Sequence, residues 1–268
     1  MLDALSYAFM QHALIAAVLV SVVSGVIGSL VVVNRMVFLT GGIAHAAYGG
    51  IGISIYFGLP MFFSTSLVAA AAALIMAHYT LYTRDKSDLL IGVIWAVGMA
   101  SGIILVDLTP GYSGDLMSYL FGSILAVERS DLYFMGTLLV ITVGVILLRY
   151  REILAVSYDS EYASLLGINV RFYYTLILIL CALSIVIAMK IVGLIMIIAM
   201  LTIPVYMAEK LSSTLLQMML YSVGFALVFT LSGLSLAYHY DLSSGPAIII
   251  SAAGYLILFL AIYKVLKR

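Results

Sequence analysis

The chain consists of long apolar runs separated by short polar breaks. Most runs are almost continuously apolar over about 20 residues, the length that a helix needs to cross the hydrocarbon core of a bilayer. Strands of a membrane β-barrel would instead alternate apolar and polar residues over segments of about 10 residues. The pattern therefore predicts nine membrane-spanning helices, at about 7–33, 36–57, 62–82, 89–106, 132–149, 172–189, 191–208, 214–237 and 246–264.

One apolar stretch between the fourth and fifth predicted spans is too short to cross a membrane. It runs from Leu116 to Val127 within DLTPGYSGDLMSYLFGSILAVERSD. A segment of this length is better interpreted as a re-entrant or interfacial helix. The predicted fold class is therefore an all-α polytopic membrane protein, with about nine transmembrane helices and a short re-entrant helix.

The basic residues predict the orientation of these spans. Lys and Arg gather in cytoplasmic loops of membrane proteins, so a correct topology places most of them on one side. An extracytoplasmic N-terminus and a cytoplasmic C-terminus put only Arg129 and Lys190 on the outer side. We expect Lys190 to interrupt the chain between two short spans and to extend its amine to the outer interface. The basic residues then predicted to be cytoplasmic are Arg35, Arg84, Lys86, Arg149, Arg151, Arg171, Lys210, Lys264, Lys267 and Arg268.

Composition agrees with this assignment. Of the 268 residues, 65% are hydrophobic and 9% are charged, and the mean hydropathy is +1.24, which excludes a soluble globular domain. No polar linker or charge run interrupts the chain, so we expect one transmembrane domain over 1–268. The single cysteine, Cys181, excludes a disulfide within the chain.

His45 lies in the middle of the second predicted span, in the stretch FLTGGIAHAAYGGIG. An ionisable side chain near the bilayer midplane must face protein or water. Four-residue spacing places Gly41, His45 and Gly49 in one strip of the helix, with Gly42 in the strip beside it. Two interpretations remain open: the small residues allow close helix packing around a hydrogen-bonded histidine, or they line a pathway in which one imidazole can ligate a transition metal.

The only sizeable predicted cytoplasmic segment covers about 150–171. Its Asp159, Glu161, Ala163 and Gly167 pattern predicts a short helix that ends at a glycine. The chain contains neither a G-x-x-x-x-G-K-[ST] loop nor an H-E-x-x-H motif. We therefore expect no enzymatic activity in this chain, and any ATP hydrolysis must take place in a partner chain.

Four motifs spread along the sequence carry a family resemblance. NRMVFLTGGIAHAAYGG resembles the second-helix signature of the metal-type ABC transporter permeases, which take up zinc, manganese or iron. YLFGSILAVERSDL is similar to their re-entrant segment, VGLIMIIAMLTIPVYMAEKLS resembles a later helix with Pro204 at the matching place, and DLSSGPAIIISA is similar to the start of their last helix. The resemblance covers about Phe9 to Tyr263.

This resemblance implies a permease subunit of an ATP-driven importer in the inner (plasma) membrane, working by alternating access. The implied partners are a cytoplasmic ABC ATPase, an extracytoplasmic metal-binding protein, a second permease copy and the lipid bilayer, without nucleic acid. No cofactor is expected on this chain, since the metal ion is its cargo and ATP is used by the partner.

The resemblance also implies roles for individual residues. Asp159, Glu161, Ala163 and Gly167 match the coupling helix that seats in the ATPase. His45 matches a histidine on the metal path, which in the family commonly follows an aspartate by four residues; here that position is Gly41.

Other interpretations of the polar residues remain. His239 and Asp241, at the outer end of the eighth span, are candidates for guiding cations or docking the binding protein, although polar residues at helix ends ordinarily mark the water boundary. An ion-gradient-driven secondary transporter is the alternative function. It would take up its cation without an ATPase, and no Asp or Glu buried in a span is available as its relay.

Overall fold

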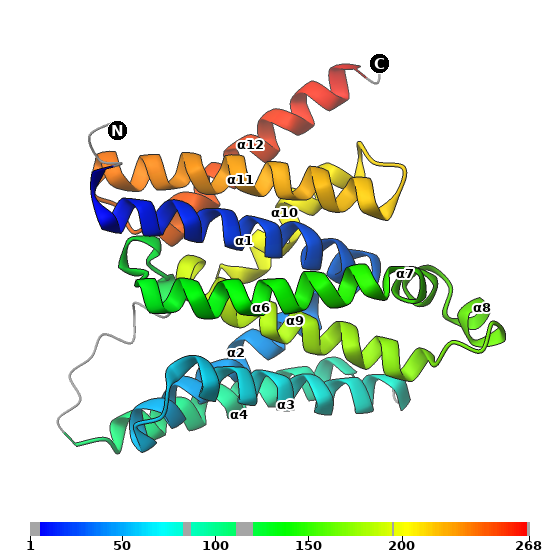
Figure 1. Ribbon diagram of the computed structural model, residues 1–268, viewed down its shortest axis with the longest axis horizontal. Helices are drawn as coiled ribbons and strands as arrows, with labels where there is room; N and C mark the ends of the chain where they lie inside the picture. Colours follow the sequence, from blue (N-terminus) through cyan, green and yellow to red (C-terminus); the bar gives the residue numbers. More distant parts are fainter. Residues whose placement is uncertain (1–5, 83–86, 111–119, 195, 267–268) are drawn as a thin grey trace. The chain divides into compact units, whose positions relative to one another are not determined.

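The structure, a computed structural model, describes residues 6–82, 87–110, 120–194 and 196–266 (Figure 1). Within these ranges it contains helices and no strand, which confirms the all-α class. The helices are α1 (Ala8–Val33), α2 (Val37–Phe57), α3 (Met61–Tyr82), α4 (Ser87–Asp107), η3 (Ile124–Ala126), α6 (Arg129–Leu148), α7 (Tyr150–Tyr158), α8 (Ser160–Leu165), α9 (Val170–Val192), α10 (Ile197–Glu209), α11 (Leu215–Tyr240) and α12 (Ser244–Leu266).

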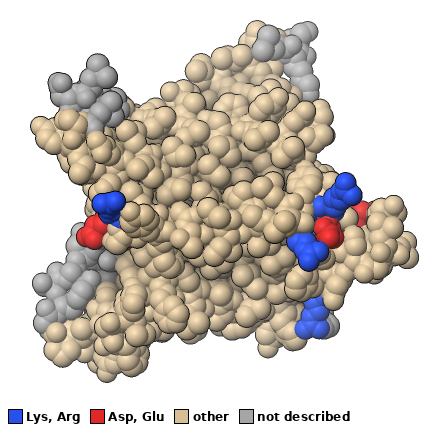
Figure 2. Space-filling view, viewed as in Figure 1, with Lys and Arg blue, Asp and Glu red and all other residues tan. Residues whose placement is uncertain are grey.

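Eight of the described helices are long and apolar enough to cross a membrane: α1, α2, α3, α4, α6, α9, α11 and α12. Charged side chains are nearly absent from the middle of the face shown in Figure 2. The chain is therefore a multi-pass membrane protein, as predicted. The seventh predicted span corresponds to α10, which has 13 residues and rises only about 20 Å. The count of nine spans and the orientation of the termini remain predictions.

The short apolar stretch before α6 is described only in part. Residues 116–119 lie outside the described ranges, and the rest contains the single 3₁₀ turn η3. The backbone N–H of Ile124 in this turn donates to Ser244 Oγ at 2.9 Å, which attaches the turn to the start of α12. Whether the segment re-enters the membrane remains a prediction.

The chain divides into two compact units, each built from separate segments. Unit 1 comprises Met1–Val32, Leu116–Leu139 and Ile187–Arg268, and unit 2 comprises Val33–Asp115 and Val140–Val186. Among the described residues, the unit boundaries fall before the last residue of α1, inside α6 and inside α9. The expectation of a single domain over 1–268 remains a prediction.

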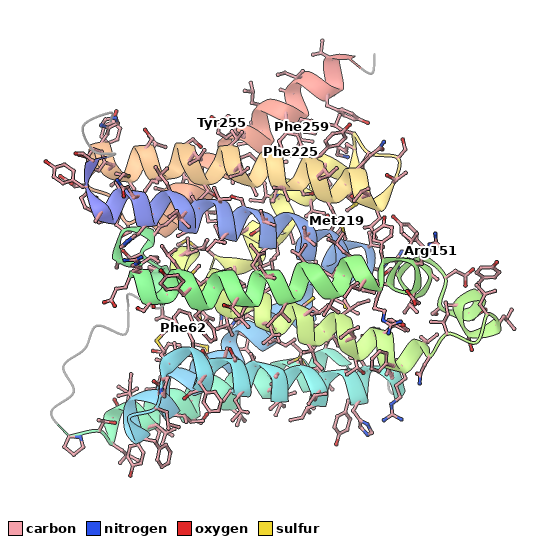
Figure 3. All side chains as sticks on the ribbon, in the orientation of Figure 1. Phe62, Arg151, Met219, Phe225, Tyr255 and Phe259 are labelled. Atoms are coloured by element: carbon pink, nitrogen blue, oxygen red, sulfur yellow. The ribbon has the colours of Figure 1, made fainter. Side chains whose placement is uncertain are left out.

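Unit 1 contains α1 packed beside α11 (Figure 1). The Ser21 and Thr230 hydroxyls of these helices lie 3.3 Å apart, and Gly25 leaves no room for a side chain next to the backbone of Val223. Aromatic rings fill the space between α11 and α12, where Figure 3 shows Phe225 and Phe259, whose ring centroids are 6.1 Å apart. Small residues thus permit close approach of α1 to α11, and large rings fill part of the space between α11 and α12.

Unit 2 contains α2, α3, α4, α7 and α8. Glycine lowers the stability of an isolated helix by about 1 kcal/mol per residue, yet α2 is helical throughout. Packing offsets this cost, because a Cβ at Gly50 would lie 2.5 Å from Thr65 Cα on α3, and one at Gly98 of α4 would lie 2.5 Å from Ala46 Cα. Helices without a strong hydrophobic drive between them associate through such small-residue contacts.

The structure corrects the predicted role of Lys190. This residue does not interrupt the chain, because α9 continues through it and ends at Val192, and the break comes at Gly193 with φ of +88°. The Lys190 ammonium pairs with the Asp131 carboxylate, which is buried near the start of the candidate span α6, although the sequence predicted no buried Asp or Glu in a span. Whether the amine lies at the membrane interface remains a prediction. A neutralised lysine can remain in a helix, and the backbone turns where glycine permits a left-handed conformation.

Candidate metal pathway and cytoplasmic coupling region

The His45 side chain is held in a defined position on α2. It is only 7% exposed, its Nδ1 lies 2.8 Å from the carbonyl oxygen of Gly41 one turn earlier, and its ring stacks on Trp95 of α4 with centroids 3.8 Å apart and planes inclined by 22°. The stacking and the hydrogen bond restrict both side-chain torsions. Trp95 belongs to the same compact unit as His45.

This hydrogen bond determines what the imidazole can do. A carbonyl oxygen only accepts, so the proton lies on Nδ1 and the neutral ring keeps a lone pair on Nε2. Metal-ligating histidines typically donate their other ring N–H to a carbonyl or carboxylate in this way. With the proton on Nδ1, the Nε2 nitrogen of His45 is the one that could ligate a transition metal.

His45 belongs to no group of three possible metal ligands in the described part of the chain. Within the described ranges, no three His, Cys, Asp or Glu side chains are close enough together to hold a metal ion. Gly41 contributes its carbonyl oxygen to the His45 hydrogen bond and has no side chain to coordinate a cation. The described residues of one chain therefore do not form a cluster of three such side chains around His45.

The glycines around His45 have neighbours on the other helices of unit 2. A Cβ at Gly42 would lie 2.6 Å from Ile91 Cγ2 and 2.8 Å from Met76 Cε, and one at Gly49 would lie 3.0 Å from the Gly98 carbonyl oxygen. Gly41 is buried. The contacts of Gly42 and Gly49 give these residues a packing role, and their role in lining a pathway remains a prediction.

The segment predicted to be cytoplasmic forms two short helices, α7 and α8, where the sequence predicted one. Asp159 begins α8, because its Oδ1 accepts from the backbone N–H of Tyr162 at 2.8 Å. Gly167, with φ of +78°, ends it: its N–H donates to Ser164 O, and the next N–H donates to the carbonyl oxygen of Ala163. The predicted start and glycine stop are therefore both present.

The surface of α8 has one buried anchor and exposed apolar side chains. Ala163 is fully buried, whereas Glu161 is exposed. Leu165 is 85% exposed and Leu166 and Tyr162 are also exposed. Large apolar side chains on a polar connecting segment are typical of a surface that contacts another protein.

The two outer-face candidates lie at the end of α11. His239 is exposed in the last turn, and Asp241 adopts the left-handed conformation with φ of +51° that ends the helix. The N–H of Asp241 donates to the Ala237 carbonyl oxygen. The structure shows a helix-terminating role for Asp241, and the docking or guiding role of the pair remains a prediction.

Sequence reasoning missed three features of this region. Trp95 was not connected with His45, although it is the only tryptophan in the chain and could have drawn attention. The pairing of Lys190 with Asp131 could have been suggested by their opposite charges on the same predicted side. A hydrogen bond from Asn34 to Ser157 left no signal in the sequence.

Comparison with known proteins agrees with the resemblance found in the sequence. Residues 6–263 match the ABC 3 transport family. The chain is 45% identical over 258 residues to an uncharacterised membrane protein of Synechocystis, with 96% of this chain and 92% of that protein covered. It is 35% identical over 257 residues to the manganese transport system membrane protein MntC of Listeria monocytogenes, covering 96% and 91% of the two chains.

A solved structure supports the same assignment. A chain of PsaBC from Streptococcus pneumoniae in complex with Fab superposes with a TM-score of 0.88 at 31% identity, covering 96% of this chain and 93% of that chain. Sequence and architecture therefore agree over nearly the whole length. This protein belongs to the ABC 3 transport family, the metal-type ABC transporter permeases.

Proposed function

We propose that this chain is the membrane-spanning subunit of an ATP-driven importer of divalent transition metal ions in the plasma membrane. The observation that carries the proposal is the presence, in one compact unit, of a histidine prepared for metal binding and of a cytoplasmic helix pair with exposed apolar side chains. Manganese is the first candidate cargo because the similar Listeria protein is named for manganese transport. Zinc and iron are also within the chemistry of an imidazole ligand.

His45 acts in this proposal as a transient ligand. Its Nε2 lone pair can bind the ion, while the Gly41 carbonyl and the Trp95 ring hold the imidazole in place. A single nitrogen binds weakly, which suits transport because an ion must leave as well as enter. Two permease copies would supply two such nitrogens. The ion would reach them from an extracytoplasmic metal-binding protein, for which His239 and Asp241 are candidate outer contacts.

The helices α7 and α8 form the proposed seat for the ATPase. The exposed Tyr162, Leu165 and Leu166 can enter an apolar groove of the partner, and Asp159 and Gly167 fix both ends of α8 so that it moves as a rigid body. Alternating access follows when ATP-driven closure of the ATPases displaces these helices. ATP hydrolysis takes place in the partner.

Reconstitution tests the proposal. Proteoliposomes should contain this chain with its ATPase and metal-binding protein, and uptake of manganese, zinc and iron should be measured with ATP and with a non-hydrolysable analogue. We expect uptake of at least one metal only with hydrolysable ATP. The secondary-transporter alternative predicts uptake by this chain alone under an imposed ion gradient, and that result would contradict the proposal.

A further inference from the structure

A side-chain hydrogen bond connects the turn between α1 and α2 to α7. Asn34 Nδ2 donates to Ser157 Oγ across 2.9 Å, and the bond is partly buried. Ser157 is the second-last residue of α7, and Asp159, which begins α8, follows two residues later. The bond therefore links the proposed ATPase seat to Asn34, which lies three residues before the start of α2.

The turn itself is tightly constrained. Arg35 has φ of +57°, a conformation that costs a residue with a side chain about 1 kcal/mol. Met36 is fully buried, and its carbonyl oxygen accepts the N–H of Thr40 in the first turn of α2. With so short and fixed a connection, displacement of Asn34 displaces the start of α2. His45 lies on that helix, about 12 Å beyond Val37 at 1.5 Å per residue.

The space between the turn and α7 is not completely filled. A cavity of about 420 Å³ lies between them, lined by Asn34 and Arg35 of the turn, Val156 and Ser157 of α7, and Thr80 of α3, among others. The Asn34–Ser157 hydrogen bond is thus a defined polar contact between α7 and the turn, and it lies beside this cavity.

We propose that the Asn34–Ser157 hydrogen bond transmits the displacement of α7 and α8 to α2, so that both residues are positioning residues for metal passage at His45. This inference rests on the proposed function. It assigns Asn34 and Ser157 no contact with the metal or with ATP. Their loss should therefore affect how much metal moves per ATP hydrolysed rather than hydrolysis itself.

The test is a double-mutant cycle on the reconstituted complex of full-length chain, ATPase and metal-binding protein. Manganese uptake and ATP hydrolysis are measured together for wild type, Asn34→Ala, Ser157→Ala and the double variant. A net hydrogen bond is typically worth enough to change an equilibrium about fivefold. We expect each single variant to lower the ratio of manganese to ATP about fivefold, the double variant to lower it no further, and hydrolysis to stay within about twofold of wild type.

Three controls separate transmission from general damage. Ser157→Thr keeps a hydroxyl and should restore most of the ratio. Ser232→Ala removes a hydroxyl that bonds only carbonyl oxygens of its own helix α11, and it should leave the ratio unchanged. Tyr174→Phe removes the hydroxyl that donates to Thr80 at the same cavity and should change the ratio less than Ser157→Ala.

An unchanged ratio in both single variants, or additive losses in the double variant, would overturn the inference. A larger effect of Tyr174→Phe would likewise overturn it by moving the route to α3 and α9. If wild type shows no ATP-dependent uptake of manganese, zinc or iron, the proposed function itself fails and the inference falls with it. Failure of the proposed function is distinguishable from failure of this inference alone, because it is already seen with the wild-type complex.

Discussion

Two glycine-rich regions of this protein use the same residue for different physical purposes. In α2 and α4 the glycines are in ordinary helical conformation and allow helices to approach, as Gly50 does beside Thr65. At the junction of η3, α9 and α12, Gly122 and Gly193 have positive φ and their backbones touch each other. A glycine count therefore does not identify a pathway, since only the backbone conformation and the neighbours separate the two uses.

The two regions also differ in charge. The sequence of α2 contains no Asp, Glu, Lys or Arg, and its one ionisable imidazole hydrogen-bonds within the helix. The η3–α9–α12 junction has the Lys190–Asp131 ion pair close by, and the Asp131 carboxylate also accepts the N–H of Glu128 at 2.9 Å. Packing of small residues stabilises the contact of α2 with α4, whereas an ion pair and glycines with positive φ stabilise the junction of η3, α9 and α12. Substitutions can test this difference.

Gly193→Ala should have the largest effect on stability. The left-handed conformation costs alanine about 1–2 kcal/mol, and its Cβ would overlap Phe121 and lie 2.5 Å from the Gly122 nitrogen, so we expect a total loss of about 4 kcal/mol. Thermal unfolding in detergent can be followed by labelling of Cys181, which is buried in the folded chain. Gly167→Ala is the matched control, because its φ is also positive but nothing lies within 4 Å, and it should lose only about 1 kcal/mol. Equal losses would show that crowding does not matter at this junction.

Gly50→Ala should destabilise the chain through overlap alone. Its backbone is helical, but the added Cβ would meet the Thr65 and Ser64 backbone at 2.5 and 2.8 Å, and we expect a loss of about 3 kcal/mol in the same unfolding assay. Gly92→Ala on α4 meets no atom within 4 Å and should gain up to about 1 kcal/mol from helix propensity. Similar behaviour of the two variants would refute the small-residue packing of α2.

Lys190→Met should have an intermediate effect that depends on Asp131. The substitution leaves a largely buried carboxylate without its cation, and we expect a loss of about 2 kcal/mol. Adding Asp131→Asn removes the stranded charge and should recover part of that loss. If the stability loss of the double variant equalled the sum of the losses of Lys190→Met and Asp131→Asn, the two residues would be energetically independent.

The apolar pattern predicted most of the fold because helix length and apolarity are local properties of a membrane segment. The start of α8 at Asp159 and its stop at Gly167 were also predictable, since capping depends on a few neighbouring residues. The end of α9 was not, because a lysine in an apolar run indicates a boundary unless its counterion is known. Asp131 lies 59 residues away from Lys190 in the sequence, and nothing local announces the pair.

The candidate site was predictable in part for the same reason. The apolar surroundings of His45 require it to face protein or water, and the structure buries it. The stacking of His45 on Trp95 depends on how α2 packs against α4. The small residues of the sequence are compatible with many helix pairs, so they do not identify Trp95 as the partner. The Asn34–Ser157 bond joins a residue of the α1–α2 turn to one near the end of α7, and neither residue by itself indicates the other in the sequence.

The most direct test of the account is manganese uptake by reconstituted complexes that carry His45→Ala. The account predicts that uptake falls at least tenfold while the complex still assembles and hydrolyses ATP. His12→Ala, which removes a histidine near the start of α1, should transport as wild type does. Unchanged uptake of manganese, zinc and iron by His45→Ala would contradict the account and leave His45 as a packing residue of α2.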